Sequence, residues 1–154
     1  MATPLAPETL SLLRQVSTAT ITSQLLKRGF RNLFLRNVRP LDAGTPHLVG
    51  PACTLRYIPY REDLATSAAL GNPEHPQRKT IENFPAEHVL VMDCRGEADA
   101  GSLGGILANR LKVRGAAGVV SDGGVRDARE IAALGLAVYC AGPAAPANIA
   151  RHHA

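Results

Sequence analysis

The stretch that decides the fold reads Gly101-Ser-Leu-Gly-Gly-Ile-Leu-Ala-Asn-Arg-Leu-Lys-Val-Arg-Gly-Ala-Ala-Gly-Val-Val-Ser-Asp-Gly-Gly-Val-Arg-Asp-Ala-Arg-Glu130. A glycine-rich turn leads into residues 106–114, and leucine recurs at every fourth position from the turn onward, at Leu103, Leu107 and Leu111. This spacing gives one apolar stripe and predicts a helix, and Gly115 is a typical residue for its end.

The second half of the stretch predicts a strand followed by another helix. Residues 117–121 form a short apolar run with β-branched side chains, which is typical of a buried strand. A turn of Asp122, Gly123 and Gly124 follows, and a helix is expected from Arg126-Asp127 to about Gly135. The predicted unit is therefore helix, strand, helix, with glycine at both turns.

The first turn is a candidate anion site. Gly104, Gly105, Ile106 and Leu107 stand where the predicted helix begins, so their N–H groups have no acceptor within the helix. These donors and the helix dipole together favour a carboxylate or a phosphate.

The second turn offers a cation and carboxylates. Arg126 can hold a carboxylate or a developing enolate oxygen through two parallel hydrogen bonds. Asp127, with Glu130 one turn further on, offers oxygen ligands to a hard cation such as Mg²⁺ or Mn²⁺. Together the two turns suit a 2-keto acid chelated to a divalent metal.

A purely structural interpretation stands beside this one. Glycine turns that flank a strand are common in α/β proteins. Asp127 would then only cap the second helix, with Glu130 completing a capping pair, and Arg126 would be a surface residue.

Several of these segments resemble the RraA-like family, which includes the regulator of ribonuclease activity A and the class II 4-hydroxy-4-methyl-2-oxoglutarate aldolases. The resemblance is carried by Gly101-Ser-Leu-Gly-Gly-Ile-Leu-Ala, by Arg114-Gly-Ala-Ala-Gly-Val-Val and above all by Ser121-Asp-Gly-Gly-Val-Arg-Asp. Twenty residues lie between Gly105 and Arg126, and Glu130 stands three beyond Asp127, as in the family signature. Upstream, the segments that start at Thr18 and Leu48 are also similar.

The resemblance implies a layered β/β/α swivelling-type domain that assembles as a trimer or hexamer, with active sites in clefts between subunits. It also implies a divalent-metal-dependent lyase that acts through a pyruvate enolate, either as an aldolase or as an oxaloacetate decarboxylase. In that role the amides of Gly104, Gly105, Ile106 and Leu107 would hold the substrate carboxylate, Arg126 would stabilise the enolate, and Asp127 and Glu130 would bind Mg²⁺ or Mn²⁺. The alternative is a non-catalytic regulator of ribonuclease activity that binds another protein.

Two features depart from the family pattern. Aldolases of the family carry an acid at the position of Gly105, where it helps to hold metal-bound water. Family members also continue into further strands, whereas this sequence stops at Ala154, so the C-terminal strands are expected to be missing. We expect neighbouring subunits of a homo-oligomer to cover the open sheet edge; the alternative is a truncated, inactive product.

The amino-acid composition limits the kinds of partner that this chain is expected to bind. Aromatic residues are 4% with no Trp, which argues against stacking on single-stranded nucleic acid. A formal charge of +4 without a Lys/Arg block fits small anionic substrates. Neither a signal peptide nor a long apolar run is found, and the three cysteines read as buried free thiols, so we expect a cytoplasmic protein without membrane contact.

The remaining chain predicts two short helices and three strands. Residues 1–16 read as an N-terminal extension with a short helix, and residues 17–154 as the RraA-like domain. A helix is expected from Ser17 or Thr18 to near Arg28, and strands are expected at 52–58, 88–93 and 137–140, listed by position. Without the resemblance, periodicity would also allow a single flavodoxin-like sheet.

Other polar residues have mainly structural interpretations. Asp93, at the end of a predicted strand, is expected to bond turn amides, although Asp93, Glu97 or Asp99 could also replace the missing acid. Residues 61–85 read as an irregular surface excursion, with a short helix at Asp63–Leu70. His75 is expected to be solvated, as is the pair His152-His153.

Overall fold

The computed structural model describes residues 5–66, 68 and 71–154, and the helix predicted at 63–70 lies partly outside them. By contacts within the chain, it divides into two compact units, Met1–Arg36 and Asn37–Ala154. The predicted domain boundary between residues 16 and 17 stays a prediction, because this division concerns only contacts within one chain.

The first unit contains the two predicted helices. They are α1 (Pro7–Gln15), with Pro at its start, and α2 (Thr18–Lys27). The side chain of Ser17 accepts a hydrogen bond from the N–H of Thr20 at 3.2 Å, which is the capping predicted for this position. Neither helix has a buried residue, so the apolar side chains of both helices remain at least partly accessible to solvent.

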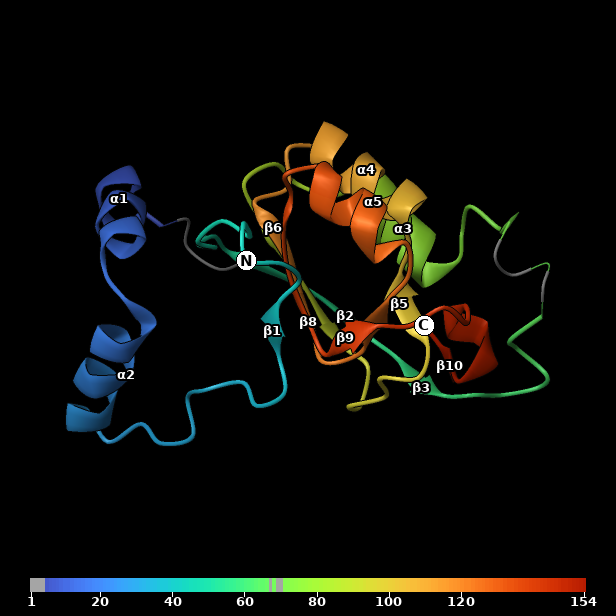
Figure 1. The fold of residues 1–154 in the computed structure, drawn as a ribbon, viewed down its shortest axis with the longest axis horizontal. Helices are drawn as coiled ribbons and strands as arrows, with labels where there is room; N and C mark the ends of the chain where they lie inside the picture. The colour runs from blue at the N-terminus through green and yellow to red at the C-terminus, as the bar shows by residue number, and fades with distance from the viewer. Residues whose placement is uncertain (1–4, 67, 69–70) are drawn as a thin grey trace. The chain divides into compact units, whose positions relative to one another are not determined.

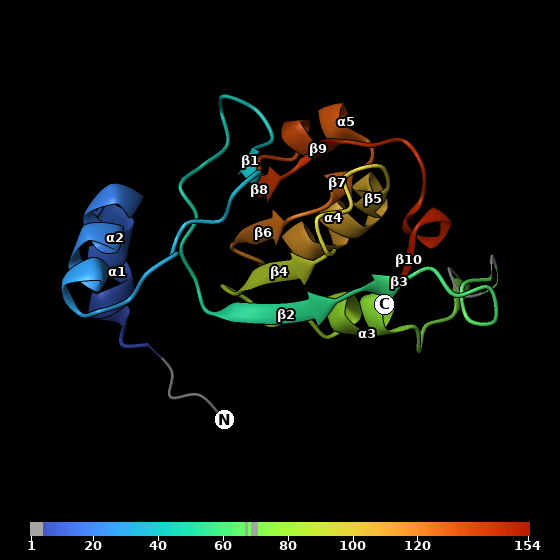
Figure 2. The same ribbon diagram turned by 90° about the horizontal axis from the view of Figure 1, so that it is seen from below.

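The second unit is built on a five-stranded sheet in the order β1-β8-β6-β4-β2. Its parallel strands are β2 (Ala52–Arg56), β4 (Val89–Asp93), β6 (Gly118–Ser121) and β8 (Ala137–Cys140). The two-residue β1 (Arg39–Pro40) pairs antiparallel with β8 at one edge. Figure 2 shows β2, β4 and β6 side by side and pointing the same way. The predicted strands are confirmed, although the first ends at Arg56.

A second, three-stranded parallel sheet accompanies the first, in the order β5-β7-β9. Its strands are β5 (Gly101–Leu103), β7 (Gly124–Val125) and β9 (Gly142–Pro143). The expectation of plain turns at Gly101 and Gly124 was therefore wrong. Glycine obscured these strands, because it is depleted in strands and suggests turns.

A further pair of strands and a short helix complete this unit. The strand β3 (Ile58–Pro59) pairs antiparallel with β10 (His152–His153), and the short 3₁₀ helix η2 (Asn148–Ala150) precedes β10. His152-His153 is thus part of a sheet, and the expectation of a solvated tail was wrong.

Three helices pack together on the second unit: α3 (Pro76–Glu82), α4 (Gly105–Val113) and α5 (Ala128–Ala133). Figure 1 shows them side by side on one face of the main sheet. Apolar side chains from helices and strands meet there in one core, which includes Ile81, Leu90, Leu111, Val119, Ile131 and Val138. The predicted helix at 106–114 is confirmed within one residue at each end.

The helix α3 was not predicted, since His75-Pro76 reads as a chain breaker inside an irregular segment. Pro76 instead occupies the first turn of the helix, where its missing N–H costs nothing. Gln77 and Ile81, four residues apart, are both buried and fix the helix against the core.

These two sheets and their helices form a layered α/β fold, as predicted. The flavodoxin-like alternative was wrong, because a flavodoxin-like fold has one doubly wound sheet and this unit adds the separate sheet β5-β7-β9. Among the described residues, no helix combines the length and the apolar character needed to cross a membrane.

Candidate functional site

The small sheet places the two candidate turns side by side. Since β5 and β7 are parallel neighbours, the turn into α4 and the turn into α5 both leave the carboxyl end of this sheet. The N–H of Arg126 donates to the carbonyl of Leu103 at 2.8 Å. Gly101 lies so close that a Cβ there would be 2.9 Å from the Arg126 nitrogen, and closer still to its Cγ. The contacts with Leu103 and Gly101 therefore fix the position of the Arg126 backbone, from which the side chain projects.

Asp127 ties the two turns together. Its Oδ2 accepts the N–H of Gly105 at 2.8 Å, although 22 positions separate the two residues. Asp127 stands at the N-cap of α5 in the left-handed region, at φ 52°, and makes no capping bond to α5. The alternative interpretation, in which Asp127 only caps α5, was wrong: its carboxylate accepts the N–H of Gly105, the first residue of α4, instead.

The N-terminus of α4 presents further donors. Its N-cap is Gly104, which has no side chain to accept the N–H groups of the first turn. The N–H groups of Ile106 and Leu107 have no acceptor within the helix. An anion at this end would receive these hydrogen bonds and the favourable field of a nine-residue helix.

Both turns open into one cavity of about 330 Å³. Its lining comes from α3, from the two turns and from the segment before η2, and comprises His75, Gln77, Arg78, Gly101, Ser102, Gly104, Gly105, Ile106, Leu107, Arg126, Asp127, Ala147 and Asn148. The ionisable side chains in this set are two arginines, one histidine and the single carboxylate of Asp127. The balance of charge therefore favours an anionic ligand.

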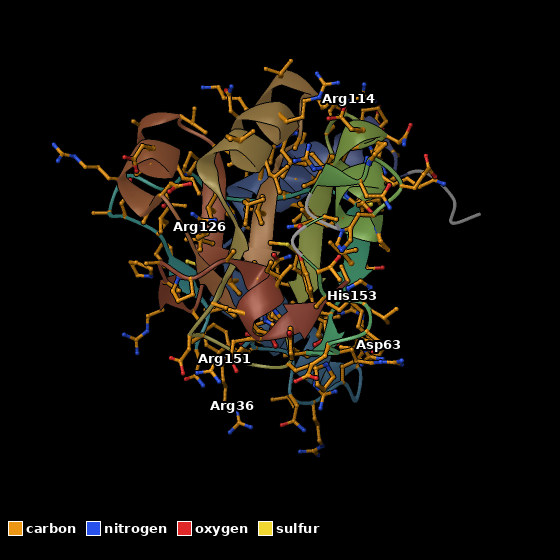
Figure 3. The ribbon with its side chains drawn as sticks, turned by 90° about the vertical axis from the view of Figure 1, so that its right-hand side faces the viewer. Arg36, Asp63, Arg114, Arg126, Arg151 and His153 are labelled. Carbon is orange, nitrogen blue, oxygen red and sulfur yellow. The ribbon has the colours of Figure 1, made fainter. Side chains whose placement is uncertain are left out.

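The predicted site residues are only partly gathered here. Gly104, Gly105, Ile106, Leu107, Arg126 and Asp127 all line the cavity. Within the described residues, no hydrogen bond or ion pair engages the guanidinium of Arg126, a residue that Figure 3 labels. Glu130 is exposed on α5 and does not line the cavity, so its predicted metal-binding role stays a prediction.

The residues present fit one kind of metal site. Among the described residues no group of three or more His, Cys, Asp or Glu side chains is arranged to hold a metal ion. One carboxylate at an open cavity nevertheless fits Mg²⁺ or Mn²⁺, since Mg²⁺ keeps several waters and takes further oxygens from its substrate. Asp127 has one oxygen bonded to Gly105 and a second that could serve such an ion.

Three further acids, at the end of β4 and in the loop after it, do not line this cavity: Asp93, Glu97 and Asp99. Arg56 donates to Asp93 at 2.7 Å and holds the pKa of that carboxyl below its usual range, helped by the N–H of Arg95. Asp93 thus bonds a turn amide, as predicted. Glu97 and Asp99 line a different hollow, so the structure does not place any of these three acids where it could replace the missing acid at Gly105.

A buried polar network, which includes three residues of the cavity lining, was not predicted from the sequence. The carbonyl of Ser102 accepts from the amide of Gln77 at 2.7 Å and from the hydroxyl of Tyr57 at 3.1 Å. Asn148 donates to the Oε1 of Gln77 at 3.1 Å, and the carbonyl of Asn148 accepts from the Nδ1 of His152. This network joins β5, α3 and η2. The spacing of Gln77 and Ile81 was the available signal, since it places a polar residue on a buried helix face.

Two histidines also differ from expectation. His75 is 5% exposed and His152 is 2% exposed, so neither is solvated. Burial lowers the pKa of both imidazoles, and the charges of His153 and Arg78 lower that of His75 further. The thiols behave as predicted for Cys94 and Cys140, which are free and buried, whereas Cys53 is only half-buried.

The first unit contains a larger hollow of about 860 Å³, formed entirely by residues between Thr18 and Arg36. Its lining includes Leu26, Phe30 and Phe34 but no carboxylate, imidazole or thiol. It therefore lacks the carboxylate, imidazole and thiol groups that most often act as acids, bases or metal ligands, and we take the smaller cavity beside Arg126 as the candidate site.

Comparisons with known proteins agree with the motifs. The model of a family described as RraA-like, Aldolase/RraA, matches residues 18–153. A protein of Halalkalibacterium halodurans, assigned by name to the 4-hydroxy-4-methyl-2-oxoglutarate aldolases, is 30% identical over 129 residues. That match covers 84% of this chain and 54% of the relative, so the chain spans about half the length of this curated relative.

Solved structures share the fold. The crystal structure of Streptomyces coelicolor RraAS2, an unusual member of the RNase ES inhibitor RraA protein family, is 31% identical with a TM-score of 0.84 and covers 99% of this chain and 72% of its own. The RNA-processing inhibitor RraA from Thermus thermophilis is 27% identical with a TM-score of 0.62, over 86% of this chain and 71% of its own.

Proposed function

The chain belongs to the RraA-like family, and we propose that it is a divalent-metal-dependent carbon–carbon lyase that acts on 2-keto acids through a pyruvate enolate. The substrates would be 4-hydroxy-2-keto acids, cleaved in a retro-aldol reaction, or oxaloacetate, which loses CO₂. Both reactions pass through the same enolate, so one site could serve both.

The observation that carries this proposal is the bond between Asp127 and Gly105. It holds a carboxylate and a helix N-terminus at one cavity, beside the Arg126 guanidinium, which no hydrogen bond or ion pair engages within the described residues. A surface that only binds another protein has no need of this combination, whereas enolate chemistry uses each part.

Each residue has a role in the proposed reaction. The N–H groups of Ile106 and Leu107 would hold the substrate carboxylate at the start of α4. The planar guanidinium of Arg126 would donate to the oxygen on which negative charge develops. Asp127, with Glu130 as a further candidate, would hold Mg²⁺ or Mn²⁺, and the ion would supply Lewis-acid polarisation of the 2-keto group.

The test is pyruvate release from a panel of 2-keto acids, measured with Mg²⁺, with Mn²⁺ and after chelation. Release that depends on the cation supports the proposal. Failure to release pyruvate from any member of the panel, with either metal present, overturns it.

A second candidate function is regulation of a ribonuclease by direct binding. It is favoured by the similarity to RraAS2, whose family inhibits RNase ES, and by Gly105, which lacks the carboxylate of the aldolases. A chain that releases no pyruvate but slows RNA cleavage by a ribonuclease would support this alternative.

We also propose that the chain works as a homo-oligomer, a trimer or a hexamer. Within the described chain, β2 pairs only with β4, so the other side of this parallel strand is an unpaired edge. Light scattering on the purified chain measures the mass directly, and an active monomer would contradict the proposal.

A further inference from the structure

Three buried side-chain nitrogens have no hydrogen-bond partner among the described residues, and all three belong to imidazoles: His75 Nε2, His152 Nε2 and His153 Nδ1. A buried polar atom without a partner is costly, so its presence needs an explanation. The ring of His75, at the start of α3, meets the ring of His153 edge-on, with centroids 5.3 Å apart, and His152 precedes His153 in β10. The three nitrogens therefore mark one region, where the start of α3 meets β10.

Residues 148–153, which form η2 and β10, are called the η2–β10 segment below. Strand pairing and side-chain contacts hold this segment in place. Its strand β10 pairs antiparallel with β3, and the ring of His152 lies against the buried ring of Tyr57, with centroids 5.0 Å apart. The contact between His153 and His75 adds a connection to α3. A segment that is held mainly at its own short strand can open without unfolding of the main sheet.

The η2–β10 segment also forms part of the wall of the candidate cavity. Asn148 lines this cavity, and its side chain donates at 3.1 Å to Gln77, which lines the same cavity. The chain just before the segment is attached to the small sheet, because Ala147 forms a bridge with Gly101 in β5. Movement of the segment would therefore take Asn148 out of the cavity wall while Ala147 stays in place.

The charged groups around His75 oppose its protonation. Burial lowers the pKa of His75, and the positive charges of His153 and Arg78 lower it further. Glu74, its neighbour in the chain, is ion-paired with Lys79 at 2.8 Å. The closed arrangement therefore favours a neutral ring at His75.

Burial has the same effect on His152. It lowers the pKa of this imidazole, although the carbonyl of Asn148 and the charges of Glu97 and Asp122 raise it. The Nδ1 of His152 lies 3.1 Å from the carbonyl of Asn148, whereas its Nε2 is covered and has no partner among the described residues. A second proton on this ring would thus be placed where no acceptor receives it.

His153 differs from the other two rings, because a carboxylate lies near it. A hydrogen bond with Arg61 lowers the pKa of Asp63, and the charge of His153 lowers it further. Figure 3 labels both Asp63 and His153. Since Asp63 can balance a charge on His153, we consider only His75 and His152 as rings that must stay neutral.

We propose that the η2–β10 segment is an acid-sensitive latch on the cavity, closed while His75 and His152 are neutral and open when they are protonated. The covered Nε2 atoms are the reason. A proton reaches them only when the segment moves away, and a charged ring is then costly to bury again. Acid therefore traps the open form. This latch does not depend on the proposed lyase function.

Proton linkage gives the size of the effect. The closed form is fully favoured above about pH 6.5, the ordinary pKa of an exposed imidazole, and loses stability as the pH falls below that value. Each ring that stays neutral in the closed form raises the opening constant about tenfold between pH 7.5 and pH 5.5. The expected rise is therefore about tenfold for one ring and about 100-fold for two.

The experiment is amide hydrogen exchange on the full chain, followed by mass spectrometry at pH 7.5 and pH 5.5 and corrected for the intrinsic rate at each pH. One reporter is the N–H of Tyr60, which donates to the carbonyl of Arg151 in the segment at 2.9 Å. The others are the N–H groups of residues 149–151, which are bonded at the start of the segment. The reference is β4 and β6 in the main sheet. We expect the opening constant of the reporters to rise about 10- to 100-fold at pH 5.5, and the reporters to exchange ahead of the reference.

Substitutions test whether the imidazoles cause this response. His75→Phe keeps a ring against His153 but cannot be protonated, so the rise should be about tenfold smaller than in the wild type. In the double variant His75→Phe with His152→Phe, the opening constant should hardly depend on pH. His47→Phe, at an exposed histidine that does not line the cavity, is the matched control and should keep the wild-type response.

Circular dichroism at pH 7.5 checks that the variants are folded, and Met replaces Phe at any position where the Phe variant is not. The comparison within the wild type needs no variant. Equal opening constants at the two pH values would overturn the latch. Reporters that exchange only together with β4 and β6 would do the same, because acid would then unfold the whole domain. A folded double variant with the full acid response would also contradict it.

Discussion

The carboxylate of Asp127 accepts the backbone N–H of Gly105 at 2.8 Å and so joins the start of α4 to the turn before α5. Two segments that the main-sheet strand β6 separates in sequence thereby become one site. The bond uses one oxygen of a carboxylate that also lines the cavity, so the second oxygen is not engaged by Gly105.

Removal of divalent cations should abolish turnover of 2-keto acids, and Mg²⁺ or Mn²⁺ should restore it. Asp127→Asn retains an oxygen that can accept the Gly105 N–H but loses the negative charge that a hard cation requires. Calorimetric titration with Mn²⁺ should therefore show at least about tenfold weaker binding for Asp127→Asn, a loss typical of altered metal sites. Full turnover after exhaustive chelation would refute the metal requirement.

Arg126→Ala should lower kcat for pyruvate release by about 100- to 1000-fold, the usual cost of losing one donor to a developing oxyanion. Arg126→Lys should not rescue it, because a point charge cannot reproduce the planar fork of the guanidinium. The side chain is exposed, so melting temperatures should change little. Near-native kinetics for Arg126→Ala would support the alternative interpretation, in which Arg126 is a surface residue with no part in the reaction.

Gly101→Ala should impair the site through Arg126 rather than through its own chemistry. The added methyl group would stand 2.9 Å from the Arg126 nitrogen, and backbone atoms at that distance must shift. We expect a loss of kcat comparable with that of Arg126→Ala. Gly44→Ala is the matched control, because its methyl group would meet only an atom of Asp42, at 3.6 Å. Normal kinetics in Gly101→Ala would show that the turn can move without effect on Arg126.

Mild acid should destabilise the fold through the buried imidazoles. Burial lowers the pKa of His152 in the folded chain, so between the folded pKa and the unfolded value of 6.5 the unfolded chain binds more protons. The contribution of neutral His152 to stability is therefore complete above about pH 6.5 and declines as the pH falls through the folded pKa.

His152→Phe should flatten this loss, since Phe keeps a ring against Tyr57 and cannot be protonated. The carbonyl of Asn148 would keep a partner in the N–H of Arg151. The measurement is the free energy of urea unfolding at several pH values between 5 and 8. An equally steep decline in His152→Phe would assign the acid sensitivity to other groups.

The sequence by itself determined the alternation of elements around the site. The recurrence of Leu107 and Leu111 predicts α4, and Gly115, at φ 78°, ends it as a residue without a side chain can. The short apolar run before Asp122 predicts β6. These signals are local, because helix periodicity and left-handed glycine act within a few residues. The same local motif located Arg126 and Asp127 and carried the family resemblance.

Only the tertiary structure decided which groups share the cavity. From the sequence, Asp127 can be interpreted either as a ligand or as the cap of α5. Only the pairing of β5 with β7 brings its carboxylate to the N–H of Gly105. Glu130 lies only three positions after Asp127 in sequence yet does not line the cavity. His75 lies far from Arg126 in sequence, and its neighbourhood depends on the packing of α3, which Pro76 begins rather than breaks. Contacts between distant segments arise from burial and strand pairing, and no periodicity in a single segment encodes them.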